Sequence, residues 1–356
     1  MTDEPRGAST APADGAPASG PASPATAAPE PLPAHLHEAA RLYGVGAGDL
    51  KPLGAYESDV YAFERLGAPR ILKVIAPTHR TPDLVRAEVD WLLALREAGV
   101  TVAEPVRAVT GEWVELLPDS GHVLVAFERA PGDLVPAKRW TDELLTRWGR
   151  LLGQLQAHAR GWTAPGPRRR ALADHSYSGR LAELAEEVPA FVAAAQDVVD
   201  RAAPLLAGGG AGYETGLVHG DLHSGNFLAY EDTLTAIDFD DCGYGSYAFD
   251  LAMPLYYAVR LLMRVHEGMT GAQAAERFLT PFLRGFQEAA PLPDGGGEAI
   301  DLALRLRQVE LVAAVRLKFL RSKDDPGLVA LEEDLRDRVV SGADMVPLPT
   351  LKAFFG

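Results

Sequence analysis

The spacing of apolar residues changes near Pro131-Gly132, and this change limits the folds that the chain can adopt. Before it, apolar and polar residues alternate in short runs between turn-forming residues, as in β-strands. After it, apolar residues recur every three or four positions over long stretches, as in amphipathic helices. The pattern therefore predicts an α+β fold with two lobes: a small, mostly antiparallel sheet with one inserted helix, then a larger, mainly helical part.

The boundaries of several elements can be predicted in the first lobe. A helical pattern begins at Leu36, and a second helix opens at Pro82 and ends at Gly99. The strand-like runs are residues 59–64, 70–75, 112–116 and 122–128. Because a Gly-Ala-Pro segment, residues 67–69, separates the first two runs, we expect them to form a hairpin.

The second lobe carries a series of helical patterns. They cover residues 144–159, 180–206, 247–265, 272–289, 300–321 and 328–340, and a β-rich island covers 217–238. Residues 1–33 are rich in Ala, Pro, Gly and Ser and show no hydrophobic period, so we expect a disordered tail. We place the lobes at residues 34–130 and 131–345.

Composition narrows the class of protein. Hydrophobic residues make up 47% of the 356 residues, which is ordinary for a soluble globular protein. The net charge of −15 argues against a nucleic-acid partner, because phosphates are bound by clustered Lys and Arg. No apolar run approaches the roughly 18 to 20 residues of a membrane span. The acidic N-terminus, with Asp3 and Glu4, is unlike a secretory signal, and the single cysteine excludes an internal disulfide. We therefore expect a cytoplasmic protein with no membrane partner.

Two polar clusters stand beside short apolar strands in the second lobe. The first is His219-Gly220-Asp221-Leu222-His223-Ser224-Gly225-Asn226, and the second is Ile237-Asp238-Phe239-Asp240-Asp241. Phosphoryl transfer needs a carboxylate that orients the attacking hydroxyl and Mg²⁺ held by hard oxygen ligands. Asp221 and Asn226 are five residues apart, the interval found in the catalytic loop of protein kinases. Turn formation explains an isolated Asp, but not this spaced set.

Together these segments strongly resemble the signature of the aminoglycoside phosphotransferase family. This family includes choline kinase-like, homoserine kinase-like and fructosamine kinase-like enzymes and a bacterial Ser/Thr protein kinase. The resemblance implies a two-lobed, protein-kinase-like fold that transfers the γ-phosphate of ATP or GTP, with Mg²⁺, to a hydroxyl. Matched by position, Asp221 is implied as the catalytic base, Asn226 as a Mg²⁺ ligand and Asp238 as the principal Mg²⁺ ligand.

The resemblance also suggests roles for residues near these three. It implies that His219 braces the loop and that Asp250 anchors it. His223 is open between a contact with substrate or phosphate and none. Asp240 and Asp241 are open between a metal contact and a contact with a substrate amine, and at least one of them should be paired because of the local negative charge.

The first lobe should supply a cation for the α- and β-phosphates. Lys73 lies in an apolar strand and resembles the lysine of the third kinase strand. Lysine is rarely buried without a partner, and Glu88 on the following helix is the partner that we expect. We therefore assign Lys73 and Glu88 to the nucleotide site.

Two further segments are implied to contact the nucleotide. The loop of residues 53–61 lacks the glycine pattern of protein kinases but resembles the looser phosphate loop of the family, with Gly54 and Ser58 as the candidates. A simple turn explains this loop equally well. The segment after the last strand of the lobe is implied to bind adenine through main-chain atoms of Glu128 and Ala130.

The acceptor is not identified by any motif. Aromatic and charged residues of the helical lobe are its candidate ligands: Tyr247, Tyr256, Tyr257, Arg260, Glu310, Arg316 and Lys318. The leading function is a small-molecule kinase, and the alternatives are a Ser/Thr kinase acting on proteins or peptides and an inactive nucleotide-binding protein. Between Asp238 and Asp250 the chain has one serine, Ser246, and no threonine, which favours the small-molecule reading over a kinase switched by phosphorylation.

Overall fold

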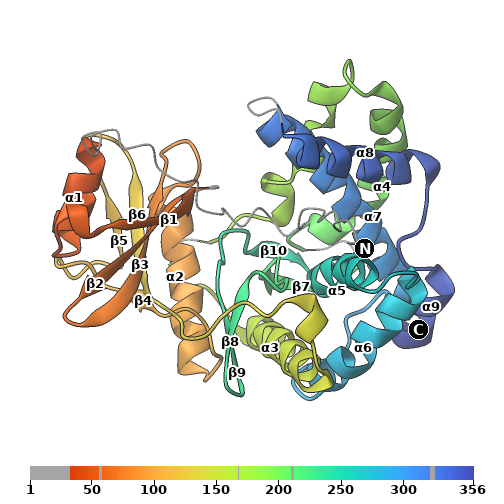
Figure 1. Cartoon of the computed structure of the whole chain (residues 1–356), viewed down its shortest axis with the longest axis horizontal. Coiled ribbons are helices and arrows are strands. Elements are labelled where there is room, and N and C mark those ends of the chain that lie inside the picture. Colours follow the sequence, from red (N-terminus) through yellow and green to blue (C-terminus); the bar gives the residue numbers. More distant parts are fainter. Residues whose placement is uncertain (1–32, 56–57, 167, 210–211, 321–324) are drawn as a thin grey trace, which may run out of the picture.

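The structure is a computed structural model that describes residues 33–55, 58–166, 168–209, 212–320 and 325–356. The predicted disordered tail, residues 1–33, lies outside these described residues except for Pro33. The predicted α+β class is confirmed. An antiparallel sheet with its helices comes first along the chain, and a mainly helical region follows (Figure 1).

An antiparallel sheet of six strands forms the first region. The strands are β1 (Lys51–Ala55), β2 (Asp59–Arg65), β3 (Ala68–Ile75), β4 (Pro105–Val106), β5 (Val114–Leu116) and β6 (Val123–Glu128). Their order is β1-β2-β3-β6-β4, and β5 also pairs with β6. The predicted hairpin is present, with Tyr61 opposite Leu72 in the β2–β3 pair.

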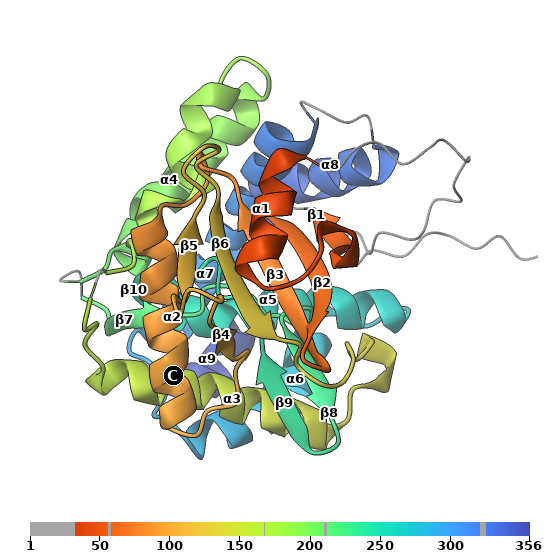
Figure 2. The same ribbon diagram turned by 90° about the vertical axis from the view of Figure 1, so that its left-hand side faces the viewer.

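Two helices pack on opposite faces of this sheet (Figure 2). Side chains alternate between the faces of a strand, so Leu72 and Leu124 face helix α1 (Ala34–Leu42). Ile75 and Val125 face the other way, toward helix α2 (Pro82–Glu97). Helix α2 begins where predicted, because Thr81 caps it by accepting a hydrogen bond from the amide of Leu84 at 3.4 Å.

The sheet is tied at two places to a hairpin of the second region, formed by β8 (Phe227–Tyr230) and β9 (Thr233–Ala236). At one place, the amide of Ala103 donates to the carbonyl of Ala236 at 2.9 Å. At the other, Asp133 pairs with Ala229 just after the last strand of the sheet. This approach requires Gly132, where φ is +93° and a Cβ atom would lie 2.2 Å from the carbonyl oxygen of Ala229.

The second region is built from helices around a small β-rich centre. The helices are α3 (Asp142–Gly161), α4 (Pro189–Leu206), α5 (Tyr247–Val265), α6 (Gly271–Gln287), α7 (Gly296–Ala314), α8 (Pro326–Ser341) and α9 (Leu348–Phe355). Besides the hairpin, strand β7 (Thr215–Val218) pairs with β10 (Gly243–Ser246). Trp148 of α3 is fully buried against Phe227 and Phe278, and its indole N–H donates to the carbonyl of Leu222 at 3.1 Å. The core therefore directly supports the first polar cluster, residues 219–226, which is called the polar loop from here on.

Some short elements were not predicted. Strand β1 overlaps the predicted phosphate loop of residues 53–61, and β10 lies between the second polar cluster and the predicted helix at 247, where no element was predicted. Helix α9 lies beyond residue 345 and packs against α7, where the amide of Gly297 donates to the carbonyl of Gly356 at 2.9 Å. The lobe boundaries remain a prediction. No helix within the described residues is long and apolar enough to cross a lipid bilayer.

Candidate active site

The β8–β9 hairpin brings the two polar clusters together. Asn226 immediately precedes β8, and Asp238 follows β9 by two residues. Phe227 pairs with Ala236 across the hairpin, and the amide of Ile237 donates to the carbonyl of Asn226 at 2.9 Å. The eleven residues between Asn226 and Asp238 thus include the whole hairpin, which places these two residues at the same end of it.

The loop before β8 is held by its own polar side chains. The side-chain amide of Asn226 donates to the carbonyl of Asp221 at 2.9 Å. The amide of Gly225 donates to Nδ1 of His223 at 2.8 Å, and the amide of His223 donates to the carbonyl of Asp221 at 2.8 Å. These bonds fix Asp221 relative to Asn226 and leave the side-chain oxygen of Asn226 for another ligand.

His219 belongs to the first cluster and also contacts the second, which is the kind of contact that a bracing residue would make. Its ring is fully buried and tilts against Phe239, with centroids 4.5 Å apart. Nε2 lies 3.2 Å from the carbonyl of Ile237, and Nδ1 accepts from the amide of Asp221 at 3.3 Å. Burial lowers the pKa of His219, so the imidazole is neutral and its two nitrogens are one donor and one acceptor.

Asp250 on helix α5 fixes the start of the loop. Its carboxylate accepts from the amide of Gly220 at 2.9 Å and from the side chain of Gln156 at 3.1 Å. Gly220 has φ +82°, and a Cβ atom there would lie 2.8 Å from the carbonyl of Asp241, so the turn requires glycine. Burial raises the pKa of Asp250 to about 6, although its hydrogen bonds act in the opposite direction.

We expect Asp250→Ala to lower the free energy of unfolding by about 1–3 kcal/mol, because it leaves the buried amide of Gly220 unpaired. The pKa of Asp250 is higher in the folded chain than the usual aspartate value, so the folded form takes up a proton first as the pH falls. The stability difference between wild type and variant should therefore grow from about pH 7 to about pH 5. Urea unfolding of both proteins across this range measures it, and a constant difference would contradict the titration of Asp250.

Lys73 projects from β3 toward the second cluster. Its Nζ lies 2.7 Å from Oδ1 of Asp238 and 2.6 Å from Oδ1 of Asp240. Burial opposes the charge of Lys73, but the two carboxylates outweigh it and raise the pKa of the lysine above its usual value. The sheet region thus presents a fixed positive charge at residues 237–241, which contain the candidate metal ligand Asp238 and are called the metal segment from here on.

The expected ion pair between Lys73 and Glu88 is absent from the described residues. Glu88 is buried and accepts instead from Arg80 at 2.9 Å, and Arg80 also pairs with Asp240 at 2.7 Å. Arg169 lies 3.8 Å from Glu88 and donates to the carbonyl of Asp240 at 2.6 Å. The pairing prediction was wrong because Arg80, which it did not consider, lies between Glu88 and the metal segment and takes the glutamate.

The region around Asp238 suits a magnesium ion. Asp238 is about half exposed and has φ +61°, a left-handed conformation that costs energy for any residue but glycine. No cluster of three His, Cys, Asp or Glu side chains that could hold a metal occurs in the part of the chain that the structure describes. Mg²⁺ is typically bound by one or two protein oxygens plus substrate phosphates and waters. The carboxylate of Asp238 and the amide oxygen of Asn226 fit that donor set.

The other candidate nucleotide residues lie on the sheet region. Gly54 is in β1, and Ser58 is buried just before β2 with no hydrogen-bond partner for its hydroxyl among the described residues. Tyr56 and Glu57 of this loop lie outside the described residues. The amide of Glu128 already donates to the carbonyl of Glu104 at 2.8 Å, so a base contact there would fall to the carbonyl of Glu128. Ala130 follows the end of β6 by two residues.

The helical candidates for the acceptor site separate into two groups. Glu310 accepts from the amide of Tyr177 at 2.8 Å, and Arg316 pairs with the buried Glu332 at 2.7 Å, so both join helices. Tyr257 lies at the polar loop, with its ring 4.5 Å from that of His223. Arg307 of α7, which sequence reasoning did not single out, donates to Oδ1 of Asp221 at 2.8 Å.

The other four acceptor candidates are Tyr247, Tyr256, Arg260 and Lys318. Tyr247 and Tyr256 are fully buried, and Arg260 lies 3.7 Å from Asp334 of α8. Lys318 lies in the π-helical turn after α7, with Nζ 5.7 Å from the ring centroid of Phe319.

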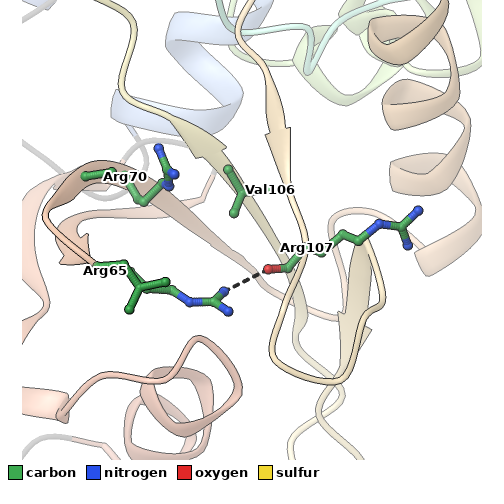
Figure 3. A pocket seen from close by; sticks show the side chains of 6 residues that line it. Arg65, Arg70, Val106 and Arg107 are labelled. Atoms are coloured by element: carbon green, nitrogen blue, oxygen red, sulfur yellow. Dashed lines mark hydrogen bonds between the residues drawn. The ribbon is translucent and has the colours of Figure 1, made fainter.

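A cavity of about 350 Å³ opens beside the β2–β3 turn (Figure 3). It is lined by Arg65, Leu66, Ala68, Arg70, Val106 and Arg107. Arg70 pairs with Glu128 at 3.0 Å, and Arg65 donates to the carbonyl of Arg107 at 2.9 Å. Arg70 and Lys73 are three residues apart on β3, so they lie on opposite faces of the sheet. The cavity is therefore separate from the site around Lys73.

A sheet that presents a lysine to an aspartate-rich segment, beside a loop with Asp and Asn five residues apart, is the arrangement of a phosphotransferase. The chain matches the phosphotransferase enzyme family, APH, over residues 49–286, and it belongs to that family. It is therefore an ATP-dependent kinase of small-molecule hydroxyl groups.

Similar proteins found by sequence and by structure are also named as kinases. Amicoumacin kinase of Bacillus subtilis (strain 168) is 29% identical over 288 residues, which span 80% of this chain and 84% of that protein. The structure of amicoumacin kinase hAmiN in complex with AMP-PNP, Ca²⁺ and Ami has a TM-score of 0.79 at 24% identity and covers 88% of this chain and 94% of that one. A microcompartment-associated aminopropanol kinase has a TM-score of 0.64 at 23% identity and covers 88% of this chain and 98% of that one. The two structural likenesses show the fold.

Proposed function

We propose that this kinase phosphorylates a hydroxyl group of an amicoumacin-like antibiotic, with ATP as the donor and Mg²⁺ as the metal. The observation that carries the proposal is the 29% identity to the amicoumacin kinase of B. subtilis, which extends over most of both chains. That span includes the polar loop, the metal segment and much of the helical region from which acceptor contacts would come.

In this proposal Asp221 is the catalytic base. It lies near the start of a loop whose backbone is fixed by Asn226, Asp250 and Trp148, and this fixes the position from which its carboxylate projects. It would take the proton of the acceptor hydroxyl as the hydroxyl oxygen bonds to the γ-phosphorus and the bond to the ADP oxygen breaks. If Asp221 is the base, turnover depends on its carboxylate. The affinity for nucleotide does not depend on it.

The proposed metal ligands are Asn226 and Asp238. Mg²⁺ bound there would neutralise the charge of the triphosphate. Lys73, buried and charged beside Asp238, would add a second positive charge for the α- and β-phosphates. Glu88 would act on the nucleotide site indirectly. It binds Arg80, and Arg80 binds Asp240, which lies beside Lys73.

The proposed nucleotide contacts on the sheet region are made mainly by the backbone. The carbonyl of Glu128 and the amide of Ala130 would meet the adenine edge, and Gly54 and the buried hydroxyl of Ser58 would lie near the phosphates. A main-chain contact reads hydrogen-bond donors and acceptors rather than side-chain chemistry. Competition of GTP against ATP in the assay below would measure how strictly this edge selects adenine.

The first test is phosphorylation of amicoumacin by the purified full-length chain with γ-labelled ATP and Mg²⁺. We expect label in the antibiotic, and about 10²–10⁴-fold slower labelling with Asp221→Asn. A parallel incubation with a size-fractionated extract of the host would detect other acceptors. Asp221-dependent label in a different small molecule would replace the proposed acceptor, and label in proteins would favour the Ser/Thr kinase alternative. Absence of Asp221-dependent label in both would contradict the proposal.

A further inference from the structure

The carboxylate of Asp221 has unlike partners at its two oxygens. Oδ1 accepts from Nη2 of Arg307 at 2.8 Å, and Oδ2 lies 3.5 Å from Nε2 of His223. Burial lowers the pKa of His223, which makes the ring neutral, and its Nδ1 already accepts from the amide of Gly225. Within the described residues, Arg307 is thus the one cation at hydrogen-bond distance from Asp221.

Arg307 is itself fixed by its neighbours. Its Nη2 also donates to the hydroxyl of Tyr257, and its guanidinium lies 5.3 Å from the centroid of that ring. One helical turn further along α7, Glu310 accepts from the backbone amides of Tyr177 and Ser178, which holds the helix against the preceding segment. A side chain on a rigid helix, packed on an aromatic ring, can define the position of its partner closely.

Stability alone does not explain this arginine. Its Nε is buried and has no acceptor among the described residues. An unpaired buried N–H costs about 1–3 kcal/mol, and burying a guanidinium and a carboxylate together gains little over apolar packing. Burial opposes the charge of Arg307, but Tyr257 and Asp221 raise its pKa further above the usual value, so the charge persists.

We propose that Arg307 is a positioning residue for phosphoryl transfer: it holds Oδ1 of Asp221 so that Oδ2 is directed to the acceptor hydroxyl. The inference rests on the proposed role of Asp221 as the base. Arg307 and Tyr257 belong to helices α7 and α5 of the helical region, so the acceptor side of the site sets the orientation of the base. Arg307 acts through Asp221 and needs no contact with ATP.

The test is a double-mutant cycle with water and amicoumacin as parallel acceptors, measured as release or transfer of labelled phosphate. We expect Arg307→Met to lower kcat about 100-fold, the loss typical of a misplaced catalytic group, with KM for ATP unchanged. Arg307→Lys, which keeps the positive charge and a hydrogen-bond donor, should recover part of the loss. Added to Asp221→Asn, Arg307→Met should cause no further loss, because the group that it positions is already gone.

Arg305→Met is the matched control. Arg305 lies on the same helix but pairs with Asp301 at 2.8 Å, away from the loop, and its loss should leave kcat near wild type. If Arg307→Met does not fold, Tyr257→Phe replaces it in the cycle, since it removes only the hydroxyl that accepts from Arg307. Losses that multiply in the double variant, a change confined to KM, or an equal loss in Arg305→Met would overturn the inference. Full activity of Asp221→Asn would instead overturn the proposed base.

Discussion

Asp221→Asn should reduce turnover by about 10²–10⁴-fold, the range over which a general base contributes to catalysis. The substitution keeps the size of the side chain and its ability to accept from Arg307, so the loop should stay in place. Affinity for ATP should remain near that of wild type. In the part of the chain that the structure describes, the partners of the Asp221 carboxylate are Arg307 and His223, and not Lys73 or the side chains of the proposed metal ligands. Steady-state kinetics and a nucleotide titration on the same preparation measure both quantities.

A matched control for this variant is His223→Asn. His223 lies 3.5 Å from Oδ2 of Asp221 and contacts Tyr257, but it carries no charge at neutral pH. We expect it to affect turnover far less than Asp221→Asn. Turnover of Asp221→Asn within tenfold of wild type would remove Asp221 from the role of base.

Asp238→Ala should abolish the dependence of nucleotide binding on Mg²⁺. Residues that merely orient a metal ligand contribute about 10–100-fold to metal affinity, so loss of a direct ligand should cost at least that much. Lys73 keeps its second partner, Asp240, at 2.6 Å, and the variant should therefore fold. Calorimetric titration with ATP, once with Mg²⁺ and once with a chelator, measures the effect.

The control for Asp238→Ala is another aspartate of the same hairpin. Asp232 is fully exposed in the β8–β9 turn and pairs with Arg147 at 2.9 Å. Exposed ion pairs contribute little, so Asp232→Ala should bind Mg²⁺ and ATP as wild type does. An unchanged Mg²⁺ dependence in Asp238→Ala would show that the metal is bound elsewhere.

The fold was predictable because its long elements carry a clear hydrophobic period. Helices α3 and α5 and strands β2 and β6 begin and end within a few residues of the predicted positions. Strand β10, with the sequence Gly-Tyr-Gly-Ser, has too few apolar residues to show alternation. Its pairing with β7 depends on contacts between segments that are distant in the sequence, which a periodic pattern does not contain.

The site was predictable only in part, for a related physical reason. Asp221, Asn226 and Asp238 are close in the sequence, and one short hairpin with its adjoining loop is enough to bring them together. Arg307 is 86 residues from Asp221 and stands in a helix whose pattern resembles that of any other buried helix. The pairing of Glu88 failed in the same way, since the competing Arg80 lies in a loop without a periodic signal.

The ion pairs of Asp240 with Lys73 and Arg80, and of Arg80 with Glu88, connect the sheet region to the segment that follows β9. Because these charges are largely buried, removing one partner leaves the others uncompensated, and such a loss costs about 3–5 kcal/mol. A substitution at any of these four side chains is therefore expected to lower stability as well as activity.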